Sequence, residues 1–486
     1  AQAKTMTKDM TQGSIPKLLL EFALPLMVGN IFQMLYNTVD SIVVGNFVGT
    51  NALAAVSSTT MVTNMSVFFF NGFSIGATVI IGKYFGAGDH KKLHRAVETT
   101  MAATFLLCLL FTAFFLSAND FMLRFMKTPP DVFGEASLYL RIYFAGVTGL
   151  LLYNMGSGVL RAVGDTKRPL YFLVLTSVLN IILDLIFVLQ FHMGIAGVAY
   201  ATILAQFISA AATMAVLIRT DDIYCFRLGD LCLDWGILKE IFCVGLPAAI
   251  QSVITSFSNI FVQSYINFFG PTTMAGWGCY NKIDQFVMLP VQSMAMASTT
   301  FVAQNVGAQK DKRADEGTVS SIILSLGIVG VITTLLVLFA DTALRLFTSD
   351  EGVILSGVDF IHVNLFFMLF NCVNQVLAGA LRGRGDSVAP MVIMLFSFVF
   401  FRQIYLFIVS HIQNEPHLMA FGYPLGWMIA VSCFISITKN QDGKNALLDS
   451  CMYELPAGSS FSISCGLMAE QEAPLLGTRK ASLMHE

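Results

Sequence analysis

A run of 21 residues without one charged side chain, SSIILSLGIVGVITTLLVLFA at 320–340, constrains this chain more than any other feature of its sequence. About 20 apolar residues in a helix span the ~30 Å hydrocarbon core of a bilayer. A second such run, MAATFLLCLLFTAFFLSA, lies at 101–118. Because lipid offers no hydrogen bonds to the backbone, only helices and closed barrels cross it, and runs of this length indicate helices. The sequence therefore predicts an all-α, polytopic membrane protein.

The composition supports this class and excludes several others. Only 12% of the 486 residues are charged, whereas a soluble domain carries about 25%. The formal net charge of −3 gives no argument for a nucleic-acid partner, and the nine cysteines include no CxxC pair and no zinc-site spacing. The segment GATVIIGKY at 76–84 fails as a phosphate loop, because five residues separate its glycines and Tyr84 replaces Ser or Thr. We expect no enzyme, no cofactor, no structural metal and no ATP-driven pump.

Twelve apolar runs separated by polar breaks predict twelve transmembrane helices. Their approximate bounds are 22–45, 54–80, 97–117, 137–157, 170–189, 195–217, 240–266, 275–300, 319–340, 357–379, 389–410 and 418–437. Fifteen Lys and Arg residues fall in the loops on the side of the termini, against three on the other side. Because cytoplasmic loops carry an excess of Lys and Arg, both termini are predicted to be cytoplasmic.

The two halves of the chain repeat each other. LRAVGDTKRP at 160–169 and LRGRGDSVAP at 381–390 share five of ten residues, and Pro25 pairs with Pro247 at nearly the same offset. We interpret the LRxxGD segments chiefly as cytoplasmic turns, in which Gly, Asp and Pro shape and cap the helix ends, with a gating contribution as the alternative. The repeat predicts two homologous six-helix bundles in parallel orientation around a shared cavity, which is a transporter architecture.

These observations predict five regions. They are a cytoplasmic N-terminal segment 1–21, an N-terminal six-helix lobe 22–218, a cytoplasmic linker 219–239, a C-terminal six-helix lobe 240–437, and a cytoplasmic tail 438–486. The tail is rich in Ser and Gly and has no long apolar run, so we expect it to be disordered.

Polar side chains inside the predicted membrane spans are the candidate functional residues. LTSVLNIILDLIF at 175–187 carries Asn180 and Asp184, four residues apart on one helix face. A charge at the bilayer centre costs about 2.5–3.5 kcal/mol on insertion scales, so such residues usually face a cavity and have a function. Asp40 of the first predicted span and Thr202 of the sixth add a second acid and a hydroxyl.

Together these four residues predict a proton or sodium site. Hard cations prefer oxygen ligands, and two neighbouring carboxyls resist losing both protons. The alternative is that the two acids are permanently hydrogen-bonded structural groups.

Several segments carry a resemblance to a known family. The chain resembles the multidrug and toxic compound extrusion (MATE) family of secondary transporters over roughly residues 12–437. Besides the LRxxGD loops, the segments that carry the resemblance are ALPLMVGNIFQMLYNTVDSIVVGNFVGTNALAAV (23–56), VIIGKYFGAGDHKKLHRAV (79–97) and GIAGVAYATILAQF (194–207). The resemblance implies two six-helix lobes in a prokaryotic plasma membrane. It also implies export of drugs or toxic metabolites, often amphipathic cations, by alternating access against a proton or sodium gradient.

The resemblance also implies where the ion binds. The DinF-like branch of this family carries an acid in the first helix, Asn-x-x-x-Asp in the fifth and Thr in the sixth, and the residues here that match are Asp40, Asn180, Asp184 and Thr202. The NorM-like branch places its key acids on helices seven and ten. The polar residues in those helices here are neutral: Gln251, Thr255, Asn259, Asn371, Asn374 and Gln375. We therefore expect ion coupling in the N-terminal lobe.

The remaining predictions concern the substrate and the first helix. The residues expected to line the substrate cavity are Gln33, Tyr36, Asn37, Asn154 and Gln206. Pro25 lacks a backbone N–H and gives the first helix a place to bend. The alternative function is a lipid-linked precursor flippase of the same superfamily, which should carry many more Arg and Lys residues toward the cavity. A receptor or scaffold that lost transport is a third possibility, and the retained polar set argues against it.

Overall fold

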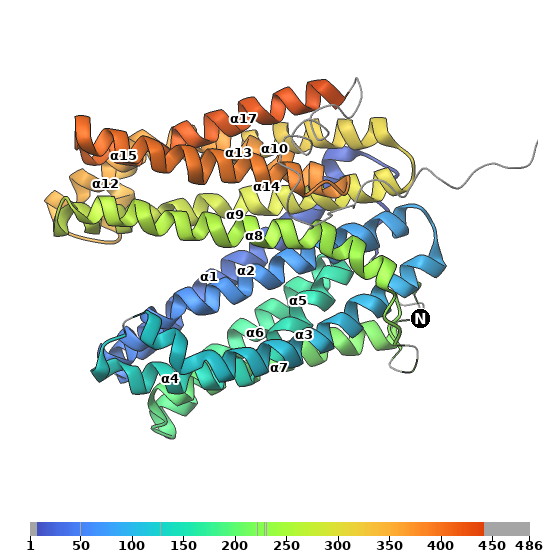
Figure 1. Ribbon diagram of the computed structural model, residues 1–486, viewed down its shortest axis with the longest axis horizontal. Coiled ribbons are helices and arrows are strands. Elements are labelled where there is room, and N and C mark those ends of the chain that lie inside the picture. Colours follow the sequence, from blue (N-terminus) through green and yellow to red (C-terminus); the bar gives the residue numbers. More distant parts are fainter. Residues whose placement is uncertain are drawn as a thin grey trace, which may run out of the picture. The chain divides into compact units, whose positions relative to one another are not determined.

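The structure of the protein, a computed structural model, describes residues 7–48, 50–126, 128–220, 222–227, 229 and 231–441. The chain divides into two units, Ala1–Lys439 and Asn440–Glu486. The predicted tail therefore lies almost entirely outside the described residues, and the helices described below all belong to the first unit, apart from the last residues of the final helix (Figure 1).

The first half of the chain folds into helices with short connections, two of which end in a π-helical turn. Its helices are α1 (Ile15–Val43), α2 (Thr50–Gly86), α3 (His90–Phe125), α4 (Pro130–Ala145), α5 (Val147–Ala162), α6 (Lys167–Leu185) and α7 (Gly194–Arg219). The π turns, η1 and η2, follow α1 at Val44–Val48 and α6 at Ile186–Gln190.

The second half repeats this pattern with more breaks. Its helices are α8 (Trp235–Asn267), α9 (Pro271–Gly307), α10 (Asp311–Leu338), α11 (Ala340–Arg345), α12 (Glu351–Asn364), α13 (Met368–Gly383), α14 (Val388–Leu395), α15 (Arg402–Ile412), α16 (Pro416–Ala420) and α17 (Gly422–Gln441). A 3₁₀ turn at Leu365–Phe367 joins α12 to α13, and a π turn, η5, at Phe396–Phe401 joins α14 to α15.

The predicted fold class is confirmed. By length and composition, eleven helical segments of the described chain can each cross a membrane. The pair α4 and α5 forms a twelfth span that bends by 46° at Gly146. Long apolar side chains such as Leu109 and Leu338 remain about 70% exposed, as expected where a helix faces lipid instead of water. Each span overlaps one predicted from the sequence, although α1 begins at Ile15, earlier than expected.

The two lobes meet mainly along α2, which packs against α8 and α9 (Figure 1). Glycines make the close approach possible: a Cβ at Gly76 would lie 2.3 Å from the carbonyl oxygen of Ile241, and one at Gly86 1.9 Å from that of Gln304. Small residues let membrane helices approach through their backbones. These contacts lie at the end of the bundle where α1 begins and α2 and α9 end, which we call the seam end.

The polar N-terminal segment is ordered at the seam end, which the sequence did not predict. Residues 8–13, which we call the N-terminal strap, hydrogen-bond to both lobes. The N–H of Lys8 donates to the carbonyl of Val163 at 3.1 Å, and that of Met10 to Oε1 of Gln304 at 2.9 Å. Further bonds to the strap come from three side chains of the second lobe: Asn305, Lys310 and Arg313.

The two LRxxGD segments form the same turn in both lobes. Gly164 and Gly385 have φ of 82° and 95°, where glycine is favoured. The carboxylate of Asp165 accepts two backbone N–H groups at the start of α6, and Asp386 does the same at the start of α14. This geometry fits the interpretation of both segments as helix-capping turns.

Candidate ion and substrate site

Asp184 lies at the end of α6 with none of its surface exposed. Neither carboxyl oxygen has a hydrogen-bond partner among the described residues. The π turn η2 begins two residues later, and π turns within helices occur frequently at functional sites. A buried carboxyl without donors is costly in either charge state unless something binds to it.

Asp40 brings a second carboxyl to the same place from α1. The side chains of Asp40 and Asp184 lie close enough to interact with each other, although Oδ1 of Asp40 has no hydrogen-bond partner of standard geometry. Within the described chain no Lys, Arg or His forms an ion pair with either acid. The π turn η1, after Asp40, contacts η2, so both acids lie next to irregular helical turns.

Asn180 and Thr202 complete the predicted set. Asn180 lies one turn before Asp184 and is 1% exposed; its Nδ2 donates to Oγ1 of Thr202 at 3.4 Å. Thr202 in turn donates to the carbonyl of Val198 in its own helix. Oδ1 of Asn180 has no partner among the described groups. The structure thus brings the four predicted ion-site residues together from α1, α6 and α7.

This arrangement is suited to a proton or a hard monovalent cation. Four buried oxygens, from Asp40, Asp184 and Asn180, lack donors, and carboxylate and amide oxygens are ligands of hard cations. Two carboxyls in contact cannot both remain charged without a cation, because like charges raise each other's proton affinity. One proton, or one bound cation, would remove that conflict.

Two tyrosines of α4 extend the site and were not predicted. Tyr139 lies within electrostatic range of both Asp40 and Asp184, and also of Tyr36. Its ring stacks on Tyr143, with centroids 6.2 Å apart. The available signal was the four-residue spacing of the two tyrosines in SLYLRIYFAG, but nothing in the sequence alone distinguished them from packing aromatics.

The residues predicted to line a substrate cavity are only partly brought together. Gln33 and Asn37 are exposed, and Tyr36, between them on α1, contacts Gln33. Asn154 donates to the carbonyl of Leu150 in its own helix, at 3.0 Å. Gln206 is half-buried one turn after Thr202. A single cavity shared by these residues remains a prediction, as does the bend at Pro25, through which α1 continues as helix.

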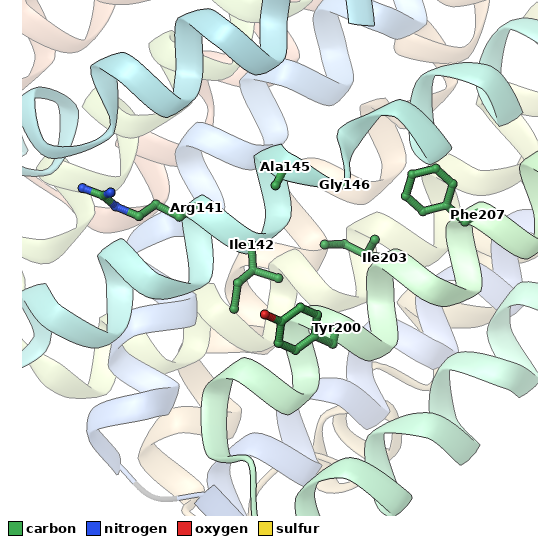
Figure 2. A pocket seen from close by; sticks show the side chains of 7 residues that line it. All are labelled: Arg141, Ile142, Ala145, Gly146, Tyr200, Ile203 and Phe207. Atoms are coloured by element: carbon green, nitrogen blue, oxygen red, sulfur yellow. The ribbon is translucent and has the colours of Figure 1, made fainter. Parts of the chain in front are cut away.

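Two cavities lie elsewhere in the bundle. A cavity of about 530 Å³ is lined by apolar side chains of α2, α3 and α8, among them Met65, Phe111 and Ile254. A second cavity, of about 340 Å³, lies at the bend between α4 and α5 and is bordered by α7. Figure 2 shows that the charged end of Arg141 points away from the other lining residues; Arg141 forms an ion pair with Asp120. None of the predicted cavity residues lines either space.

Comparison with known proteins places the sequence repeat on firm ground. A protein-family model described as MatE matches residues 25–186 and again residues 247–408, at an offset of 222 residues. The two matches coincide with the two halves of the structure.

Individual relatives are similar over most of the chain. A probable multidrug resistance protein, YpnP, from Bacillus subtilis is 33% identical over 80% of this chain and 87% of its own length. A probable multidrug resistance protein, NorM, from Thermotoga maritima is 28% identical over 79% and 83%. A structure described as the outward-facing conformation of a multidrug resistance MATE family transporter superposes with a TM-score of 0.84. That superposition covers 91% of this chain and all of the other, at 23% identity, and it supports the fold.

Proposed function

We propose, from the premise that this chain belongs to the MatE family, that it is a secondary active exporter of small amphipathic compounds, often cationic. Membership rests on the two matches to the family model and on the 33% identity to a relative named a multidrug resistance protein. A bundle of twelve spans in two lobes can expose a central site to each side of a membrane in turn.

The paired acids of the first lobe carry the proposal that transport is coupled to an ion. Asp40 and Asp184 contact each other in the membrane part of the bundle and have no cationic partner in the described chain. We propose that they exchange H⁺ or Na⁺ with the help of Asn180 and Thr202. Because drug binding is proposed to involve Gln33, Tyr36 and Asn37 on the same helix as Asp40, ion occupancy would change the affinity for a cationic drug.

The sidedness follows from the basic residues. We propose that the seam end is cytoplasmic, because the excess of Lys and Arg lies in its loops. The cell membrane of a prokaryote is the proposed location, in line with the bacterial sources of the relatives named above.

The flippase alternative is less well supported. A pyrophosphate-bearing substrate would need unpaired cationic side chains in the cavity. The buried arginines instead donate to neutral residues of their own lobes: Arg161 to Ser74, and Arg382 to Gln251.

Efflux of a fluorescent cationic dye from everted membrane vesicles tests the proposal, with proton and sodium gradients imposed separately. We expect Asp184→Asn to abolish gradient-driven efflux, since it removes an ionisable group and little volume. Asp120→Asn is the matched control, because it removes an exposed carboxylate that is paired with Arg141. Efflux at the wild-type rate in Asp184→Asn would exclude coupling through this site.

A further inference from the structure

A buried arginine of the second lobe lies in a polar cluster outside the ion site. Arg402, at the start of α15, is 3% exposed. Its Nη2 donates to Oγ of Ser258 and to Oδ1 of Asn259, both at 2.8 Å and both on α8. The ring of Tyr423, on α17, lies 4.5 Å from the guanidinium, and its hydroxyl donates to the same Asn259 oxygen. One cation therefore joins three helices through neutral groups.

No acid compensates this charge. In the described chain no ion pair involves Arg402, and its Nε has no hydrogen-bond partner. Asp284, the acid of neighbouring α9, accepts instead from Tyr280. An unpaired charge inside a membrane protein is costly and usually marks a function, while oxygen ligands and an aromatic face are what a bound cation needs.

The repeat aligns this cluster with the ion site of the first lobe. The two family matches are related by an offset of 222 residues. At that offset Asn37 aligns with Asn259, and Asn180 aligns with Arg402. The guanidinium of the second lobe is therefore attached at the position from which the first lobe supplies an amide to its site.

The acids of the first lobe have no counterparts in the second. At the same offset Asp40 aligns with Val262 and Asp184 with Leu406, both fully buried apolar residues. The first lobe thus has two negative side chains and no cation of its own at this site. The second lobe lacks both negative side chains and has instead a covalently attached cation, Arg402.

We propose that Arg402 is a built-in cation, which takes in the second lobe the place that the exchangeable ion takes in the first. It holds α8, α15 and α17 together through Ser258, Asn259 and Tyr423 throughout the transport cycle. Ion exchange and the helix movements that it causes are confined to α1, α6 and α7. Arg402 is a positioning residue in this scheme, and it does not contact the drug.

This inference rests on the proposed ion coupling, and hydrogen exchange of the full-length purified protein separates the two. With saturating coupling ion, we expect slower exchange in α1, α6 and α7, and unchanged exchange in α8, α15 and α17. Absence of an ion effect in the first lobe would overturn the proposed coupling, and this inference with it. Ion-dependent protection of α8, α15 or α17 would overturn the inference while leaving coupling intact.

Variants of Arg402 test the cation itself. In Arg402→Ala we expect exchange in α8 and α15 to rise about tenfold or more, because hydrogen bonds to a charged group are lost, and dye efflux to fall accordingly. Millimolar guanidinium should restore both, whereas urea, its neutral isostere, should not. Arg402→Lys keeps the charge and should retain most activity, which keeps the test valid if the alanine variant folds poorly. Equal rescue by urea, or a loss in Arg402→Lys as large as in Arg402→Ala, would overturn the proposal.

Discussion

The seam between the lobes offers the sharpest test of how this structure relates to the transport cycle. Gly86, at the end of α2, and Gly307, at the end of α9, face each other's helices. A Cβ at Gly86 would lie 1.9 Å from the carbonyl oxygen of Gln304, and a Cβ at Gly307 would lie 1.9 Å from that of Lys83. Both neighbours are backbone atoms, so they cannot rotate away. Gly86→Ala can be accommodated only if α2 and α9 separate.

The size of the effect can be worked out from the overlap. Carbon–oxygen contacts normally lie at about 3.3 Å or more, so the added methyl overlaps the carbonyl by more than about 1 Å. Forcing such a group into a packed contact costs about 1–3 kcal/mol. This cost falls on the state in which the seam end is closed and not on a state in which it is open. The equilibrium should therefore shift toward the open state by roughly 5–150-fold.

Spin labels on both sides of the seam end measure this shift. Cysteines at the exposed positions 91 and 312, in a background without the native cysteines, report the distance between the lobes at that end. Gly278→Ala is the control on the same helix as Gly307, because its Cβ would meet no atom within 4 Å. We expect a longer-distance population in Gly86→Ala and none in the control. An unchanged distance distribution in a folded Gly86→Ala protein would refute the reasoning.

Three further predictions concern the strap, the first helix and the topology. Gln304→Ala removes the acceptor for the Met10 N–H and a donor to a carbonyl of the first lobe, so hydrogen exchange of residues 8–13 should speed up and the open population should increase; unchanged exchange would contradict a role for the strap. Pro25→Ala should preserve ion-dependent drug binding at equilibrium but slow dye efflux, and unchanged turnover would remove the bend from the mechanism. Cysteines placed at 88–92 should label from the cytoplasm and those at 270–273 from outside, and the reverse pattern would invert the proposed orientation.

Much of the fold could be predicted, because membrane spans are written directly in the sequence as apolar runs of bilayer length. The bend between α4 and α5 could not, since it depends on a contact with a distant helix. A Cβ at Gly146 would lie 2.4 Å from the side chain of Ile203 on α7. The strap escaped prediction for a similar reason: its partner Gln304 lies 294 residues away from Met10 along the chain.

The candidate site shows the same division. Asn180 and Asp184 could be placed on one helix face from their spacing, and the resemblance to a family brought in Asp40 and Thr202. Their assembly in the structure agrees with that prediction, and ion binding there stays a proposal. Tyr139 could not be identified, because only the packing of α4 in the folded bundle brings it near the acids.

The ion site and the seam are connected by α1, and linkage turns that connection into a last prediction. The strap runs directly into α1, Lys8 pairs with Glu21, and Asn30 donates to Ser293 on α9 at 3.4 Å. Asp40 lies ten residues further along the same helix, about 15 Å at 1.5 Å per residue. Because the acids contact each other in this closed-seam structure, we expect the closed state to bind the ion more tightly than the open state.

Apparent affinity then falls with the fraction of molecules in the binding-competent state. Gly86→Ala, which changes no residue of the ion site, should weaken ion binding by no more than the factor by which it opens the seam. Ion titration of tryptophan fluorescence or of hydrogen exchange in α6 gives the affinity, and the spin-label distances give the population. A seam that opens in Gly86→Ala without any loss of ion affinity would show that α1 does not couple the two ends.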